Sequence, residues 1–207
     1  MAGGAMTVRR ITALMLGAAL LVLGFAGSAN AGEAPPVHLV GGNANGQHLF
    51  VIGDSITDIT TPDLTKTLKR YSYVIDATVG IKMAAQLPTI QRTVATTPPQ
   101  DWIIELGTND WANPNAQQDF TNEVNAVSGQ NCVVLVTTAP LVQSLKALNA
   151  RMGQIAATNK KFHVLDWGDI EYKQPHLTLP DAIHPSIKGQ QKLASLERWI
   201  LKADCPR

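Results

Sequence analysis

Four short polar segments of this 207-residue chain contain residue types that together can carry out acyl transfer. A serine hydroxyl is a weak nucleophile until a base removes its proton, and a histidine held by a carboxylate is a common base. The first segment contains Ser55, and the last contains Asp181 and His184 in the spacing Asp-x-x-His. We therefore expect Ser55 to attack an acyl carbonyl, His184 to take up its proton and Asp181 to orient the imidazole ring.

The two middle segments contain residues that can stabilise the negative charge of a tetrahedral intermediate. Such a charge requires hydrogen-bond donors that are already in position. The candidate donors are the backbone N–H groups of Ser55 and Gly80 and the side-chain amide of Asn109. Trp111 and Asn113 follow closely in the sequence, so we expect them to line the substrate pocket.

Each of these residues also has an ordinary structural interpretation. Ser55 alone could be a helix cap, because serine and aspartate are favoured there. Gly80 and Asn109 alone could be turn residues, and His184 followed by proline could simply begin a helix. The catalytic interpretation depends on all four segments occurring in order, each beside a predicted strand end or in a loop.

Short apolar strands and helices alternate along the rest of the chain. Strands are predicted at 48–52, 73–78, 102–106, 132–137 and 162–166, and helices at 62–70, 82–94, 116–127, 141–158 and 187–202. Pro88 should kink or divide the second helix. The pattern predicts an α/β fold with a five-stranded parallel sheet covered by helices on both faces. Since sites in such sheets lie at the carboxyl ends of the strands, the four segments should meet at one edge.

Taken together, the four segments resemble the motifs of the SGNH hydrolases, the esterases and lipases of the Gly-Asp-Ser-Leu type. Gly53-Asp54-Ser55-Ile56 matches the nucleophile motif, Gly80 and Asn109 match the oxyanion-hole positions, and Asp181 with His184 matches the acid–base motif. The resemblance extends from the first predicted strand to the last helix. It implies a flavodoxin-like three-layer α/β/α sandwich and chemistry without a cofactor.

The resemblance also has departures. Ile56 replaces the leucine of the motif, and Ile59 and Thr60 stand where many members have glycine, so the turn after the nucleophile can differ. The segment 166–181, which includes Trp167, is similar to the extracytoplasmic SGNH domains attached to membrane acyltransferases. Hydrolysis and acyl transfer therefore both remain open.

The first 31 residues have the pattern of a secretory signal peptide. A basic pair at 9–10 is followed by an apolar run at 11–25 and by Ala29-Asn30-Ala31, which a signal peptidase can recognise. A membrane anchor is the alternative, but the run is short for a span. We expect a signal peptide at 1–31, a flexible leader at 32–47 and the hydrolase domain at 48–207. Either Met1 or Met6 could be the start.

Composition excludes several classes of partner. The formal net charge of +1 is far from the strongly basic balance of a nucleic-acid-binding protein. The sequence contains no cluster with metal-ligand spacing and no phosphate-binding loop. We therefore expect no metal, no cofactor and no nucleic acid, and a monomer without stable membrane insertion after cleavage.

Two cysteines, Cys132 and Cys205, suggest a disulfide in an exported protein, with two free buried thiols as the alternative. Cys132 opens a predicted strand at the edge opposite the polar segments. The last helix begins near His184 and should run back to that far edge, which would bring Cys205 close to Cys132.

These observations predict a secreted serine esterase, located outside the cell, in the periplasm or at the cell wall. Its expected substrates are small-molecule or glycan carboxylic esters with a short acyl chain, such as O-acetyl groups. An acyltransferase that acylates a cell-wall glycan uses the same acyl-enzyme and remains an alternative. The second alternative is a non-catalytic carbohydrate-binding module on the same scaffold.

Overall fold

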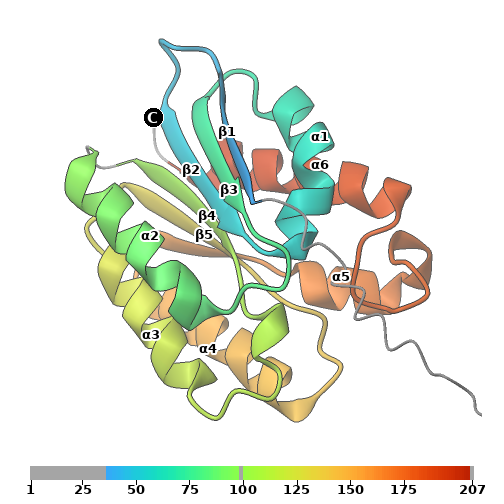
Figure 1. The fold of residues 1–207 in the computed structure, drawn as a ribbon. Coiled ribbons are helices and arrows are strands. Elements are labelled where there is room, and N and C mark those ends of the chain that lie inside the picture. The colour runs from blue at the N-terminus through green and yellow to red at the C-terminus, as the bar shows by residue number, and fades with distance from the viewer. Residues whose placement is uncertain (1–35, 98–99, 206–207) are drawn as a thin grey trace, which may run out of the picture. The chain divides into compact units, whose positions relative to one another are not determined.

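A six-stranded sheet carries the fold in the computed structural model, which describes residues 36–97 and 100–205 (Figure 1). The strands are β1 (Val37–Gly42), β2 (His48–Gly53), β3 (Ser72–Ala77), β4 (Asp101–Glu105), β5 (Cys132–Val136) and β6 (Phe162–Leu165). The helices are α1 (Ser55–Thr67), α2 (Met83–Thr96), α3 (Ala116–Val127), α4 (Gln143–Thr158), α5 (Trp167–Lys173) and α6 (Ile187–Asp204). Two 3₁₀ turns, η1 (Thr108–Asp110) and η2 (Pro175–Leu177), lie in the loops. The predicted signal peptide lies outside the described residues.

The strand order is β1-β3-β2-β4-β5-β6, and β2 to β6 run parallel to one another. The chain first steps from β2 to β3 on one side and then crosses to β4 on the other. The loop after β2 therefore stands at a topological switch point, where open α/β sheets bind their ligands. This order is flavodoxin-like, and it confirms the predicted α/β architecture.

The predicted number of strands is wrong by one, because β1 adds an antiparallel edge strand. It pairs with β3 from Val37 opposite Ala77 to Gly42 opposite Ser72, within the segment predicted to be a flexible leader. Val37, Leu39 and Val40 are apolar, but Gly, Pro, Ala and Asn are common in the surrounding segment 32–47, and four of the six strand residues are exposed. The sequence therefore does not distinguish this edge strand from a leader. The strand is held by backbone pairing to β3, which composition does not reveal.

Two helices also differ from the sequence-based expectation, and in a third Pro88 causes no division. Helix α1 begins at Ser55, before the predicted start at Pro62, because the Asp54 carboxylate caps it by accepting the Ile56 N–H. Helix α2 continues through Pro88 without division. The short helix α5 was not predicted, because seven residues give too little periodicity to distinguish a helix from a loop.

Helices cover both faces of the sheet (Figure 1). One apolar layer joins Leu49 and Val51 of β2 to α1, α5 and α6, and the other joins Phe50 and Ile52 of β2 to α2, α3 and α4. Neighbouring residues of one strand thus enter opposite layers. This two-sided burial explains why the parallel strands appear in the sequence as continuous apolar runs.

The predicted disulfide between Cys132 and Cys205 is confirmed. Cys132 begins β5, at the edge of the sheet opposite the carboxyl ends, and Cys205 follows the last turn of α6. The bond therefore fixes the far end of the helix that follows His184. Within the described part of the chain, no helix is long and apolar enough to cross a membrane.

Candidate active site

Ser55 is the first residue of α1 and follows the end of β2 at Gly53. The cap that the sequence allowed for Ser55 is provided by Asp54, whose Oδ1 accepts the Ile56 N–H at 3.0 Å. A Cβ atom at position 53 would overlap the Thr57 side chain, so only glycine fits this tight strand-to-helix turn. The serine hydroxyl therefore does not cap the helix. It lies at a helix N-terminus, where negative charge is favoured.

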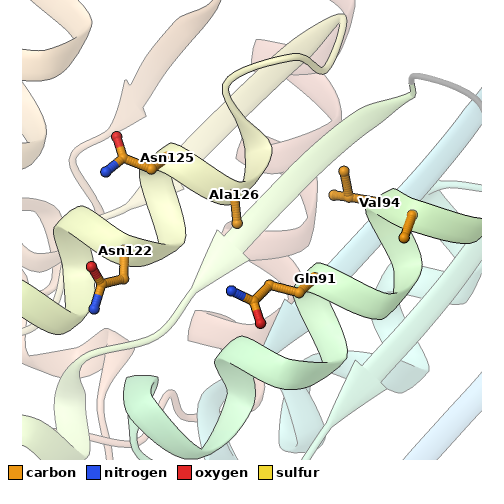
Figure 2. Close-up of a pocket in the computed structure, with 6 residues that line it drawn as sticks. Gln91, Val94, Asn122, Asn125 and Ala126 are labelled. Carbon is orange, nitrogen blue, oxygen red and sulfur yellow. The ribbon is translucent and has the colours of Figure 1, made fainter.

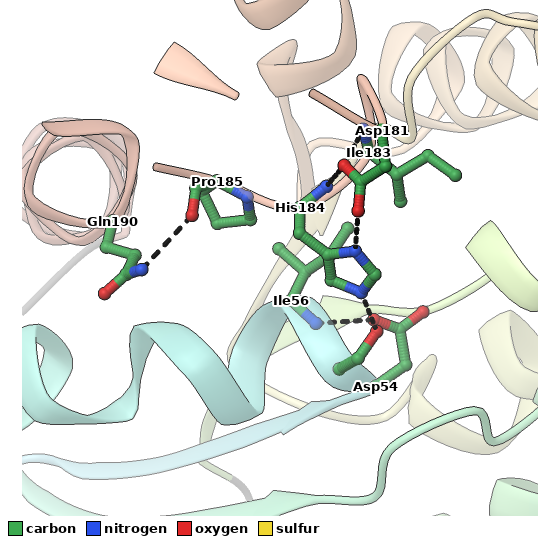
Figure 3. A network of polar contacts seen from close by, with 8 residues as sticks. Asp54, Ile56, Asp181, Ile183, His184, Pro185 and Gln190 are labelled. Carbon is green, nitrogen blue, oxygen red and sulfur yellow. Dashed lines mark hydrogen bonds and ion pairs between the residues drawn. The ribbon is translucent and has the colours of Figure 1, made fainter. Parts of the chain in front are cut away.

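His184 connects Ser55 to Asp181. Figure 3 shows the His184 ring pointing toward the Asp181 carboxylate. The ring Nδ1 lies 2.7 Å from Asp181 Oδ2, and Nε2 lies 2.9 Å from Ser55 Oγ. An ionised carboxylate can only accept, so Nδ1 carries the proton and donates it to Asp181. Nε2 is then an acceptor for the Ser55 hydroxyl, which is the tautomer that a general base requires.

Asp181 organises the turn that carries both Asp181 and His184. Asp181 Oδ1 accepts the backbone N–H groups of Ile183 and His184, each at 3.0 Å. Ala182, between Asp181 and Ile183, adopts a φ of 58°, a left-handed conformation that is uncommon for alanine. The Leu179 N–H donates to the His184 carbonyl at 2.7 Å and closes the loop. Asp181 thus fixes both the backbone and the ring of His184.

The proposed oxyanion donors lie in the loops after β2, β3 and β4. Among the described residues, no acceptor takes up the backbone N–H of Ser55 or Gly80, so both are available. Gly80 has a φ of 74°, which glycine adopts readily. Asn109 Nδ2 donates to Asp54 Oδ2 and to the Ile81 carbonyl, both at 3.1 Å. Its amide must therefore exchange one of these bonds before it can bind an oxyanion.

The residues after Asn109 separate into different roles. Asp110 is buried and accepts the Met83 N–H at the start of α2, so it positions this helix. Asn113 Nδ2 donates to Asp110 Oδ1 at 2.7 Å and to Asp119 Oδ2 at 2.9 Å, and these hydrogen bonds stabilise the loop. Trp111 is 60% exposed and lines an apolar pocket. Of the two residues expected at the substrate pocket, Trp111 lines this apolar pocket, whereas Asn113 does not belong to its lining.

The two carboxylates nearest to His184 have opposite pKa shifts. Burial raises the pKa of Asp54 to about 7, against the Ile56 hydrogen bond and the charge of His184, which lower it. Burial acts in the same direction on Asp181, but hydrogen bonds from the His184 ring and from two backbone N–H groups outweigh it and hold the pKa at about 2. Asp181 is therefore ionised at neutral pH.

All four glutamates of the described part of the chain are buried: Glu105, Glu123, Glu171 and Glu197. Glu105 accepts a 2.5 Å hydrogen bond from Thr57 in the first turn of α1, and its pKa is raised first by burial and then by the charge of Glu197. This buried group lies outside the sequence motifs, although two signals of it are present in the sequence. Glu105 interrupts an apolar strand, and Glu197 lies at helical spacing between Leu193 and Leu201, on the buried face of α6.

We expect the free energy of unfolding to fall as the pH rises from about 4.5 to about 8. Burial raises the pKa of Glu197 from 4.5 to about 8, so over this range the folded protein holds a proton that the unfolded chain releases. Each such group contributes a slope of up to about 1.4 kcal/mol per pH unit. Glu197→Gln should reduce the slope and be more stable than the wild type at pH 8.

Denaturant unfolding at pH 5, 6.5 and 8 measures this effect. Asp204→Asn, an exposed change on the same helix, serves as the matched control and should leave the slope unaltered. If Glu197→Gln shows the wild-type slope, Glu197 is not protonated in the folded protein.

Pockets lie both near and far from these side chains. A pocket of about 440 Å³ opens between α2 and α3 and is lined by small apolar residues and by the amides of Gln91, Asn122 and Asn125 (Figure 2). It contains none of the proposed catalytic residues. A second pocket, of about 170 Å³, adjoins the loops that carry Asn109 and His184, through Thr108 and Ile183. Within the described ranges, no three or more histidine, cysteine, aspartate or glutamate side chains are grouped so that they could hold a metal ion.

Comparison with solved structures identifies the fold. A GDSL-like lipase from Bacteroides thetaiotaomicron superposes with a TM-score of 0.65 at 19% identity, covering 75% of this chain and 88% of the lipase. The catalytic domain of peptidoglycan O-acetyltransferase A from Streptococcus pneumoniae gives a TM-score of 0.63 at 18% identity, over 77% and 92% of the two chains. This chain has the SGNH hydrolase fold.

An acetyl xylan esterase from Geobacillus stearothermophilus has the same SGNH fold, with a TM-score of 0.60 at 16% identity over 81% of this chain and 99% of the esterase. No protein-family model and no curated protein matches the chain in sequence. At 16% to 19% identity the similarity establishes the fold. The chemistry must be argued from the side chains.

Proposed function

We propose that the chain is a secreted serine esterase that hydrolyses short-chain or O-acetyl carboxylic esters through Ser55, His184 and Asp181. One observation carries this proposal, which is the continuous series of hydrogen bonds from Ser55 Oγ through the His184 ring to Asp181, with distances of 2.9 and 2.7 Å. The fold is that of known esterases and acylhydrolases, which supports the same chemistry.

In the first half of the reaction, Ser55 Oγ forms a bond to the ester carbonyl carbon while His184 Nε2 takes the hydroxyl proton. The resulting oxyanion accepts hydrogen bonds from the N–H groups of Ser55 and Gly80 and from the Asn109 amide. The bond to the alcohol oxygen then breaks, and His184 returns its proton to that oxygen. Asp181 stays ionised and stabilises the imidazolium form throughout.

In the second half, water enters the space left by the alcohol. His184 Nε2 removes a proton from the water, whose oxygen attacks the acyl-enzyme carbonyl. The bond to Ser55 Oγ breaks, and the proton on His184 restores the serine hydroxyl. The products are one carboxylic acid and one alcohol, and no cofactor takes part.

Labelling with a fluorophosphonate tests the proposal directly, because this reagent forms a stable bond only with an activated serine. We expect one adduct per folded chain, located at Ser55 by peptide mass spectrometry, together with hydrolysis of a chromogenic acetyl ester. Folded protein that neither reacts with the reagent nor hydrolyses esters would contradict the proposal and favour a carbohydrate-binding module.

Acyl transfer is a second candidate, favoured by the similarity to the peptidoglycan O-acetyltransferase domain. In that reaction a sugar hydroxyl replaces water in the second half. Product analysis with and without a glycan acceptor separates the two candidates. Formation of acylated glycan faster than free acid would identify a transferase.

Asn109→Ala should lower kcat by roughly 100- to 1000-fold, the usual loss when one oxyanion donor is removed. KM should change little, because the hydrogen bond strengthens only as the oxyanion forms. Steady-state kinetics measures both constants. The matched control is Asn125→Ala, an exposed asparagine on α3. A loss of less than tenfold would mean that Asn109 keeps its bonds to Asp54 and Ile81 during the reaction.

A further inference from the structure

An apolar pocket of about 170 Å³ lies against both catalytic loops. Its walls come from η1, from the loop between β5 and α4, from α4 itself and from the turn that carries His184. The lining residues are Thr108, Trp111, Ala139, Leu141, Val142, Leu145 and Ile183. Thr108 precedes the proposed oxyanion donor Asn109, and Ile183 precedes the proposed base, so the pocket adjoins the place where the ester carbonyl must sit.

Hydrogen bonds between the walls hold this pocket in shape. Ser144 Oγ at the start of α4 donates to the Trp111 carbonyl at 2.5 Å and ties the η1 loop to α4. On the other side, the Thr138 N–H donates to Asn149 Oδ1 at 3.0 Å, and Asn149 Nδ2 donates back to the Thr138 carbonyl at 2.7 Å. The loop that carries Ala139, Leu141 and Val142 is therefore anchored to α4.

We propose that this pocket binds the acyl chain of the substrate and selects chains of about four to six carbons over acetyl, an inference that rests on the proposed esterase function. The acyl group stays attached to Ser55 through both halves of the reaction, whereas the alcohol must leave and be replaced by water. A preformed apolar pocket suits the group that stays. It also suits hydrocarbon better than a sugar, whose hydroxyls would lose their hydrogen bonds to water there.

The size of the pocket sets the length of the chain. A methylene is comparable in size to a water molecule, whose share of liquid volume is about 30 Å³. The volume of about 170 Å³ therefore accommodates roughly five carbons. Each methylene moved from water into such a site should raise kcat/KM about fourfold, until the pocket is full.

Leu141 sets the limit of the pocket. A neighbouring pocket of about 170 Å³ is lined by Tyr172, Thr178 and Ala182 among others, and it shares Ala139 and Leu141 with the first. Leu141 thus forms a partition between the two. Truncation of this side chain should join them and admit longer acyl chains.

The test measures kcat/KM for p-nitrophenyl esters from acetate to decanoate. For the wild type we expect a rise to a maximum near hexanoate and a fall beyond it. Val142→Trp should fill the pocket and lower the hexanoate-to-acetate ratio roughly 30-fold. Leu141→Ala should raise the decanoate-to-hexanoate ratio about tenfold. Val40→Trp, the same change as the first on the exposed edge strand β1, is the matched control for both ratios.

The acyl pocket is supported if Val142→Trp lowers the hexanoate-to-acetate ratio of kcat/KM and Leu141→Ala raises the decanoate-to-hexanoate ratio. Val40→Trp should change neither ratio. A flat chain-length profile, or a preference that follows the alcohol when the acyl group is held constant, overturns it. In either of those cases the proposed function still stands if the reagent labels Ser55 and the protein hydrolyses esters. Absence of labelling and of turnover for every ester overturns the proposed function and this inference with it.

Discussion

Ser55→Ala is expected to lower kcat for a chromogenic acetyl ester by about 10⁶-fold, the usual consequence of removing the nucleophile of a triad. His184 Nε2 lies 2.9 Å from Ser55 Oγ and would then have no hydroxyl to deprotonate. Without an oxygen at this position no acyl-enzyme can form, and fluorophosphonate labelling should disappear. Any remaining turnover would be direct attack by water, assisted by the oxyanion donors.

The Ser55→Ala variant should fold normally, which keeps the result interpretable. The helix cap at this turn is Asp54, and alanine favours a helical conformation. Unfolding curves that match the wild type would show that the loss is chemical. Ser128→Ala, an exposed serine at the end of α3, is the matched control and should retain both labelling and turnover. If Ser55→Ala retains full activity, Ser55 is not the nucleophile.

The sequence predicted the meeting of Ser55, Asn109, Asp181 and His184 because each lies just after a strand or before a helix. Parallel strands bring their carboxyl ends to one edge, so distance along the chain is irrelevant once the strands are placed. The apolar runs that became β2, β4 and β5 are buried on both faces, and this made them clear in the sequence. The Asp-x-x-His spacing predicted the contact within the last turn for a similarly local reason.

The features that the sequence did not predict depend on contacts between distant segments. Glu105 and Glu197 become buried neighbours only when α6 packs against the sheet that contains β4. In the sequence, each of these glutamates could equally be a solvated surface charge. The Asn109 amide already donates hydrogen bonds to Asp54 and Ile81, which belong to other loops, so the sequence does not reveal these bonds. The apolar pocket combines three loops and one helix, and no single stretch of sequence contains its pattern.

Asp181→Asn should lower kcat by about 10³- to 10⁴-fold with little change in KM. The asparagine oxygen can still accept the N–H groups of Ile183 and His184, so the turn should persist. Its amide nitrogen, however, would donate to His184 Nδ1 and place the ring proton on Nε2. In that tautomer the ring cannot accept the proton of Ser55, and a loss of about 10⁴-fold is typical of such a change. The Asp181 side chain is 45% exposed, and this argues for the lower end of the range.

The pH dependence gives this prediction a second readout. Since the pKa of Asp181 is about 2, its carboxylate stays ionised from about pH 3 upward, and protonation of Asp181 cannot cause a loss of activity in that range. The asparagine variant should therefore be slow at every pH, and raising the pH should not rescue it. Fluorophosphonate labelling should slow by a similar factor, because the reagent also requires a deprotonated serine.

Asp169→Asn is the matched control for this prediction. Its side chain is 46% exposed, close to the exposure of Asp181, and it pairs with Lys173 on α5 instead of with a histidine. This variant should keep wild-type kcat and labelling. A loss of less than tenfold in Asp181→Asn would show that the bonds holding the His184 backbone are sufficient to orient the ring. The role of Asp181 would then be to shape the turn, and the ionised carboxylate would not be required.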